Sequence, residues 1–118
     1  MRAESRAAIA YIAGRLVSGR RTNAAFDYAR SQWVHFTGTV EPGRVHVYDY
    51  EVQNYVTGSG SPLSYQLFEY GGGSHIQLKL IGNRYQGFDY GSGSHFTGTV
   101  HGSQVNLYDY SAGIYFQL

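Results

Sequence analysis

A triplet of an aromatic residue, an acidic residue and a second aromatic residue recurs five times in this chain. The copies are Phe26-Asp27-Tyr28, Tyr48-Asp49-Tyr50, Phe68-Glu69-Tyr70, Phe88-Asp89-Tyr90 and Tyr108-Asp109-Tyr110. Successive copies start 22, 20, 20 and 20 residues apart. A fixed period of this length indicates one supersecondary unit repeated along the chain, which restricts the fold to repeat architectures.

A second motif lies between the triplets and divides each unit into two halves. His35-Phe36-Thr37-Gly38-Thr39-Val40 recurs as His95-Phe96-Thr97-Gly98-Thr99-Val100, with His75–Leu80 as the middle copy. Each half reads as a strand followed by a turn, for example Ser74–Leu80 and Arg84–Tyr90 joined by Ile81-Gly82-Asn83. Such short gaps cannot hold the crossovers that parallel strands need. The sequence therefore predicts a mainly β protein, an antiparallel up-and-down meander of about eight to ten strands.

Two segments depart from this rhythm. Residues 2–19 predict an amphipathic helix, because Ile9, Ile12, Ala13 and Leu16 form one stripe at helical spacing. Tyr11 lies off the stripe, and we expect it to face solvent or a partner. Val56–Pro62 is rich in Gly and Ser, and we expect a longer loop or an irregular edge between two halves there. We therefore expect a single domain, 1–118, with hairpin repeats over 24–118 in two similar halves, about 24–58 and 64–118.

Alternation along the strands predicts which side chains are buried. The expected core face carries Phe26, Tyr28, Phe36, Val40, Tyr48, Tyr50, Phe68, Tyr70, Ile76, Leu78, Leu80, Phe88, Tyr90, Phe96, Val100, Tyr108 and Tyr110. The opposite, polar face carries the triplet acids with several His and Thr residues. Because only the helix can cover so many aromatic rings, we expect the sheet to curl strongly, or to close like a barrel, around it. Gly98 is expected between Phe88 and Tyr108, under an aromatic ring.

The polar face supplies the candidate ligand-binding residues. We expect Glu69, Gln77, Asp89, Thr97 and Asp109 to form a row across neighbouring strands. Carboxylates two strands apart lie roughly 9–10 Å from each other, which is too far for a shared proton or metal ion. Exposed Tyr residues beside carboxylates can stack on sugars. The candidates are Glu69, Asp89, Asp109, Tyr65, Tyr85 and His95. The recurring His residues spread along a row instead of converging, so no metal ligand, cofactor or catalytic residue is assigned.

Charge is distributed unevenly along the chain. Residues 1–30 hold 6 Arg against Glu4 and Asp27, whereas residues 31–118 hold 3 cationic and 6 acidic side chains. The basic segment is expected to dock on the acidic remainder of the chain. Nucleic acid and membrane partners are disfavoured because the overall excess of positive charge is small. The compartment is unknown, with the cytoplasm favoured because there is no convincing signal peptide and no Cys.

Two repeat families share features with the chain. Phe36-Thr37-Gly38-Thr39-Val40 and Phe96-Thr97-Gly98-Thr99-Val100 resemble one half of the membrane-occupation-and-recognition repeat. The Gly-x-Gly of that motif's other half is absent from the Tyr-Asp-Tyr strands. The aromatic hairpins are similar to choline-binding repeats of bacterial surface proteins, which use paired Trp residues, whereas Trp33 is the only Trp here. Neither resemblance transfers a function.

Three functional hypotheses follow from the pattern. The first is a non-enzymatic binding or interaction module, with the polar sheet face or the mouth of the curled sheet contacting a small molecule or glycan. The alternative is a structural, self-assembling protein, in which a homodimer covers surplus aromatic surface. The second alternative is a hydrolase that uses the acids of the polar face. The candidate residues recur at the same position of every repeat and do not come together at one point as catalytic residues do, which favours the first hypothesis.

Overall fold

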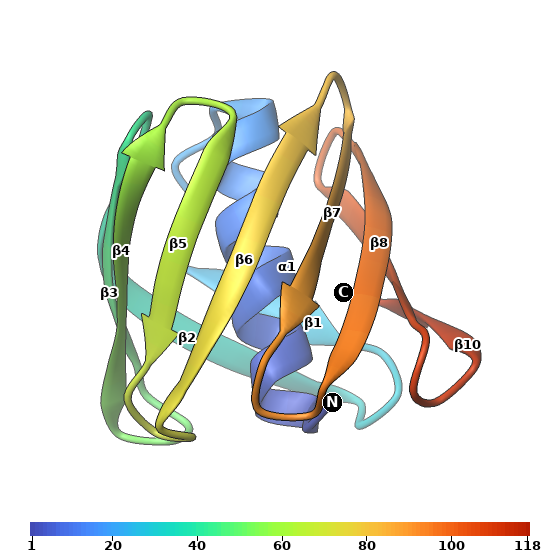
Figure 1. The fold of residues 1–118 in the computed structure, drawn as a ribbon. Coiled ribbons are helices and arrows are strands. Elements are labelled where there is room, and N and C mark those ends of the chain that lie inside the picture. Colours follow the sequence, from blue (N-terminus) through green and yellow to red (C-terminus); the bar gives the residue numbers. More distant parts are fainter.

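The computed structural model describes all residues 1–118 and consists of one helix and one antiparallel sheet (Figure 1). Helix α1 spans Ala3–Ser18. The strands are β1 (Ala24–Asp27), β2 (Gln32–Glu41), β3 (Arg44–Asp49), β4 (Asn54–Ser61), β5 (Ser64–Glu69), β6 (Ser74–Ile81), β7 (Arg84–Asp89), β8 (Ser94–His101), β9 (Gln104–Asp109) and β10 (Ile114–Gln117). They pair in sequence order within one 10-stranded sheet. The predicted up-and-down meander is confirmed.

Two kinds of turn alternate along the sheet. At one end, two-residue turns separate paired residues such as Glu41 and Arg44, or Ile81 and Arg84. At the other end, four-residue turns follow the triplet acids, as between Asp49 and Asn54 or between Asp89 and Ser94. We call this second end the acid end. One turn of each kind completes the period of the sequence repeat.

The turn lengths differ from those expected, and this reverses which side chains point inward in the strands that carry the triplets, β1, β3, β5, β7 and β9. A three-residue turn at Ile81-Gly82-Asn83 would place Leu80 opposite Arg84, but in the structure Leu80 pairs with Tyr85. Directly paired residues share a face, so this shift of one residue sends Tyr85 inward and Phe88 outward. Strands β2, β6 and β8 keep the predicted faces, with Phe36, Ile76 and Phe96 buried.

The face prediction for the triplets is therefore wrong. The second aromatic residue of each triplet is 53–60% exposed, and these residues are Tyr28, Tyr50, Tyr70, Tyr90 and Tyr110. The triplet acids are at most 4% exposed, and these are Asp27, Asp49, Glu69, Asp89 and Asp109. The aromatic side chains decorate the outside of the sheet, whereas the acids point inward.

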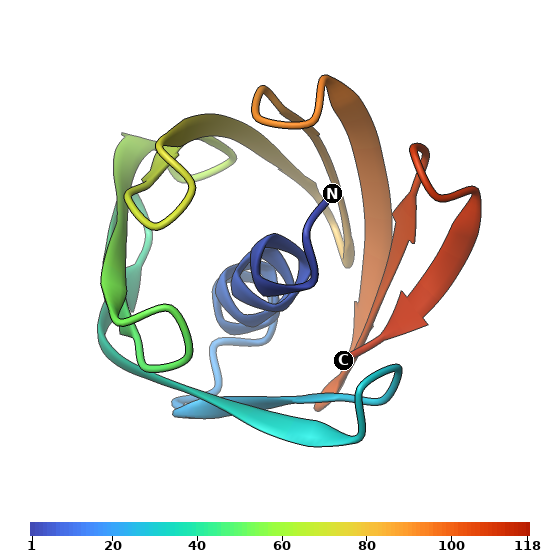
Figure 2. The same ribbon diagram turned by 90° about the horizontal axis from the view of Figure 1, so that it is seen from below.

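Helix α1 runs through the middle of the curled sheet (Figure 2). All residues from Ala7 to Ala13 are buried. This run covers every side of the helix, since one turn takes only about 3.6 residues. Tyr11 is 3% exposed and stacks on Phe36 with ring centroids 4.2 Å apart, so the expectation that it faces solvent or a partner is wrong. The structure holds no helix with the length and apolarity needed to cross a membrane.

The Gly- and Ser-rich stretch forms part of a strand paired on both sides, which corrects the prediction of a longer loop or an irregular edge. Residues 56–61 belong to β4, which pairs with β3 and β5. An added Cβ on Gly58 would lie only 2.6 Å from Leu67 Cδ2. Small residues in β4 therefore make room for the large inward side chains of β5.

The sheet is nearly closed, with one unsealed seam between its edge strands β1 and β10. No strand ladder joins these two strands. A backbone hydrogen bond from the Tyr28 N–H, directly after β1, to the carbonyl of Gln117 at the C-terminal end of β10 is 3.2 Å long and bridges the two strands. Leu118 continues past β10 and exchanges two backbone hydrogen bonds with Val105 of β9. The wall around the helix is thus complete except along this seam.

Candidate functional site

The triplet acids stabilise the turns of the acid end. A carboxylate oxygen accepts the backbone N–H two residues further on, at 2.9–3.0 Å, in four of the five copies. The acceptors are Asp27, Asp49, Asp89 and Asp109. This contact closes an Asx-type turn, a geometry that favours Asp over longer residues. The acid of the repeat therefore has a local structural role.

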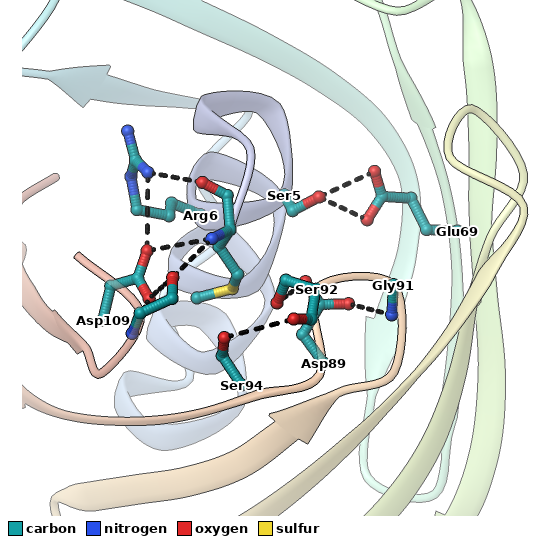
Figure 3. Close-up of polar contacts among 10 residues, drawn as sticks. Ser5, Arg6, Glu69, Asp89, Gly91, Ser92, Ser94 and Asp109 are labelled. Carbon is teal, nitrogen blue, oxygen red and sulfur yellow. Dashed lines mark hydrogen bonds and ion pairs between the residues drawn. The ribbon is translucent and has the colours of Figure 1, made fainter.

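Glu69, the one longer acid of the five, contacts the helix instead. The Ser5 hydroxyl lies within hydrogen-bonding distance of both Glu69 carboxylate oxygens, at 3.0 and 2.9 Å, and Arg2 forms an ion pair with it. On another side of the helix, Arg6 Nη1 lies 3.6 Å from Asp109 Oδ2 (Figure 3). Carboxylates close to a helix N-terminus also complement its positive dipole. These contacts fix α1 within the sheet.

The buried acids differ in their pKa because their partners differ. Burial raises the pKa of Asp49 to about 6, against the backbone hydrogen bonds that favour its ionised form. Burial likewise raises the pKa of Glu69 despite its contacts with Ser5 and Arg2. Burial also acts to raise the pKa of Asp109, but hydrogen bonds from Ser111 and the amino group of Met1 outweigh it and hold this pKa below its ordinary value.

The predicted row of acids is not formed on the outer face. Asp89 pairs with Ile76 and Ser94, not with Gln77 and Thr97 as the expected register required. Glu69, Asp89 and Asp109 are buried at the acid end, where turn backbone or helix side chains occupy them. No group of three or more His, Asp and Glu side chains is placed to hold a metal ion.

Tyr65 and Tyr85 are core residues, which corrects their placement on the polar face. The Tyr65 hydroxyl accepts the Gly43 N–H at 2.9 Å and donates to the Pro62 carbonyl at 3.1 Å. The Tyr85 hydroxyl donates to the Asn106 carbonyl at 2.7 Å, and burial raises the pKa of this phenol. Both rings are inaccessible to a ligand on the outer surface. Of the predicted ligand-binding residues, only His95 is exposed.

His95 belongs to one of five aromatic clusters on the outside of the sheet. In each cluster the two triplet aromatics meet edge to face, with centroids 4.7–5.1 Å apart, and a third ring from the next strand packs against them. The third rings are Trp33, Tyr55, His75, His95 and Tyr115. Around the His95 cluster lies a groove of about 490 Å³, lined by Phe88, His95, Tyr110, Gln77, Gln86, Thr97 and Lys79 among others.

A second hollow lies at the seam, and we call it the seam cavity. Its volume is about 340 Å³, within the range of small-molecule sites. The α1 residues that line it are Ala10, Tyr11, Gly14, Arg15 and Ser18. The remaining walls come from the segment after the helix and from the edges of the sheet, and they are Arg20, Thr22, Ala24, Ala25, Phe26, Tyr28, Trp33, Gly102, Ser103, Gln104, Val105 and Leu118. The lining passes from buried Ala10 and Tyr11 to Trp33, which is 62% exposed. The cavity therefore connects the helix with the outer surface.

The seam cavity lies beside the unsealed seam, and Gly14 of α1 is one of its lining residues. Gly14 faces β9, and an added Cβ would lie 3.0 Å from Val105 Cγ2. Gly14 interrupts an otherwise good helix sequence, and this interruption is the one sequence feature that could have drawn attention to this place. The cavity itself was not predicted, because it depends on where the two edges of the sheet stop relative to each other.

Comparison of the chain with protein-family models, with curated proteins and with solved structures found no significant match. Function is therefore argued from the geometry alone.

Proposed function

We propose that this protein is a non-enzymatic small-molecule-binding module and that the seam cavity is its binding site. The observation that carries the proposal is a concave site of about 340 Å³ that reaches from the protein surface to the central helix. Nine of its 17 lining residues are hydrophobic, and a few polar groups accompany them. This combination is typical of ligand pockets, which are mostly apolar with a small number of polar groups that orient the ligand.

Binding can be measured through the single Trp of the chain. Trp33 lines the seam cavity, so a ligand there should change its fluorescence. The first probe is phenylnaphthylamine, a neutral aromatic dye that brightens in apolar surroundings. We expect saturable dye binding together with a change in Trp33 emission.

A cavity-filling variant locates the dye. Ala24 lines the seam cavity and is half-buried, so Ala24→Phe should fill part of the space and abolish binding. Ala112→Phe makes the same change at an exposed position of an acid-end turn and should bind the dye like the wild type. Equal dye binding by the two variants, or no effect of any apolar ligand on Trp33, would disprove the proposal.

The groove around His95 supports a second candidate function, the binding of a glycan. Phe88, His95 and Tyr110 supply rings against which a sugar can stack, and Gln77, Gln86 and Thr97 supply hydrogen-bonding groups beside them. Stacking on sugars was expected of Tyr65 and Tyr85. In this candidate, the rings that stack are those of Phe88, His95 and Tyr110.

A panel of hexose oligosaccharides tests the groove by nuclear magnetic resonance. We expect chemical-shift changes confined to β6–β8 and to Tyr110, and their loss in Tyr110→Ala. Tyr50→Ala, the same change in a cluster outside the groove, should leave them intact. Shifts that survive Tyr110→Ala, or none with any oligosaccharide, would rule this candidate out.

A further inference from the structure

The arginines of residues 1–30 fall into two groups, and the difference between them points to the class of ligand. This inference rests on the proposed function of the seam cavity. Arg2, Arg6 and Arg30 form ion pairs with acids at the acid end. Arg15, Arg20 and Arg21 lie at the opposite end of α1 or just after it, and no ion pair involves them. The expected docking on the acidic remainder of the chain thus accounts for only half of these cations.

Arg15 is the unpaired cation that is held most firmly. Its Nη1 donates to the Tyr11 hydroxyl at 3.1 Å, and that hydroxyl in turn donates to the Thr22 carbonyl at 2.7 Å. Its Nε is buried and has no hydrogen-bond partner. A charged group that is partly desolvated without an anion is unfavourable, because neutral partners such as the Tyr11 hydroxyl replace only part of the water it has lost. The guanidinium is therefore positioned by its neighbours but incompletely satisfied.

On the side of the seam cavity, Arg15 faces no negative side chain, whereas Glu41 lines a separate hollow that Arg15 and Arg20 also border. No Asp or Glu side chain lines the seam cavity. Arg20 also lines it, and its Nη2 would lie 3.7 Å from a Cβ added to Gly102 in the turn between β8 and β9. Two guanidinium groups therefore border a space whose other walls include Ala10, Val105 and Leu118. Such a site is complementary to a molecule with an apolar body and one anionic group.

We propose that the seam cavity binds an amphipathic organic anion, with its carboxylate or sulfonate paired to Arg15 and Arg20 and its apolar body against the cavity wall. The anion supplies the acceptor that the Arg15 guanidinium lacks. Neutral molecules of the same shape gain only the apolar contacts. Cations of the same shape are repelled by both arginines.

Three probes with the same alkyl chain separate charge from apolar contact. Decanoate is the anion, decanol the neutral molecule and decyltrimethylammonium the cation, each titrated below its aggregation concentration against Trp33 fluorescence. We expect the affinity for decanoate to be at least about tenfold higher than that for decanol, because a hydrogen bond to a charged group contributes more than one between neutral groups. The cation should bind most weakly. Equal affinities for decanoate and decanol would overturn the proposal.

Matched arginine variants assign the effect to the cavity. Arg15→Met keeps an unbranched apolar side chain and removes the guanidinium charge, and it should weaken decanoate binding about tenfold while leaving decanol binding unchanged. Arg21→Met makes the same charge change at an exposed residue that does not line the cavity, and it should leave both affinities unchanged. Arg15 and Arg21 variants that behave alike would show that the preference is only a general charge effect.

The outcomes distinguish this inference from the proposed function. If decanol and the neutral dye bind but decanoate has no advantage, the seam cavity is a binding site and the anion inference is wrong. If no probe affects Trp33, both are wrong. Should Arg15→Met fail to fold, the comparison of the three probes on the wild-type protein still decides the question, and Arg20→Met provides the second variant.

Discussion

At the scale of single residues, Asp49 and Asp109 show how one repeat position acquires opposite properties. Both are buried and both accept a backbone N–H within their own turn. Asp109 also lies near Arg6 and the amino group of Met1, whereas no ion pair involves Asp49. Burial without a cation favours the neutral carboxyl group, and burial beside cations favours the ionised one.

The first prediction concerns the pH dependence of stability at Asp49. Its pKa rises from 3.8 to about 6 on folding, so the folded state holds a proton that the unfolded state has lost between these values. The free energy of unfolding therefore falls, relative to Asp49→Asn, as pH rises from about 4 to 7, by at most about 3 kcal/mol. Urea denaturation of both proteins across this range measures the difference.

Asp109→Asn provides the opposite case. Because the pKa of Asp109 is lowered in the folded state, its ionised form contributes stability above about pH 4 that is lost as pH falls through the folded pKa. The wild type should therefore exceed Asp109→Asn in stability most at neutral pH. Parallel pH profiles for the two variants would contradict this account of the acid end.

The second prediction concerns Gly98, which lies opposite Tyr85 and Leu107 and not between Phe88 and Tyr108 as expected. The expected aromatic cover is present, but Tyr85 supplies it. An added Cβ would collide with the Tyr85 ring and with the Asn106 carbonyl. Gly98→Ala should destabilise the protein by about 1–3 kcal/mol, the usual cost of overpacking.

Denaturant unfolding with a matched glycine checks the Gly98 prediction. Gly71→Ala places its Cβ 3.2 Å from the end of the Val52 side chain, which can move aside, and should change stability much less. Combining Gly98→Ala with Tyr85→Leu should recover part of the loss, because the smaller side chain makes room. If Gly98→Ala is as stable as Gly71→Ala, the close approach of Tyr85 is not a determinant of stability.

At the scale of elements, charged side chains near its two ends determine the direction in which α1 runs through the sheet. Its N-terminal turn meets Glu69 and Asp109, and its C-terminal turn carries Arg15 beside the seam cavity. Negative charge near the helix N-terminus and positive charge near the C-terminus both complement the helix dipole. The helix is therefore held in one direction along the axis of the sheet by charge as well as by apolar packing.

The third prediction tests the anchoring of α1. Ser5→Ala removes the hydroxyl that contacts both oxygens of the buried Glu69 carboxylate, so the free energy of unfolding should fall by about 1–3 kcal/mol. Ser18→Ala removes a hydroxyl on the same helix that donates to the Gly14 carbonyl and accepts the exposed Arg20 N–H, but contacts no buried charge, and it should cost less. Chemical denaturation of both variants decides this, and a loss from Ser5→Ala no larger than from Ser18→Ala would refute the anchoring role of Glu69.

At the scale of the whole molecule, the sheet is a ribbon wrapped around a helix, and its weakest line is the seam. Each inner strand is paired on both sides, whereas β1 and β10 are each paired on one side only. Both edge strands are 4 residues long. Local opening starts where backbone hydrogen bonds are few and exposed. The seam cavity lies along this same line, so ligand access and local opening are expected to be coupled.

The fourth prediction follows from this geometry. In native-state hydrogen exchange, amides of β1 and β10 should exchange fastest among the strands, and those of β5, β6 and β7 slowest. A ligand bound in the seam cavity should slow exchange in β1 more than in β6. Uniform protection across all strands would indicate that the seam is sealed in solution.

The sequence by itself determined the antiparallel meander through its repeat period and the N-terminal helix through helical spacing, because both depend on local patterns and on gap lengths. It placed most strands but missed β4, where a Gly- and Ser-rich stretch pairs on both sides. It could not determine which face of β3, β5, β7 and β9 is buried. In β7, for example, Tyr85 lies on one face and Phe88 on the other, so alternation fits either choice. A difference of one residue in the turn decides between them, and that difference is visible only in the cross-strand pairing.

Only the tertiary structure determined the burial of the acids and the existence of the seam cavity. An acid between two aromatic residues points outward by local rules, and it is stable inside only because turn N–H groups, Ser5 and arginines of α1 meet it there. The seam cavity requires the two sheet edges and Gly14 of the helix to come together. The contacts of Glu69 and Asp109 with α1, and the meeting of the helix with the two sheet edges, join residues far apart in the chain, and no local pattern encodes them.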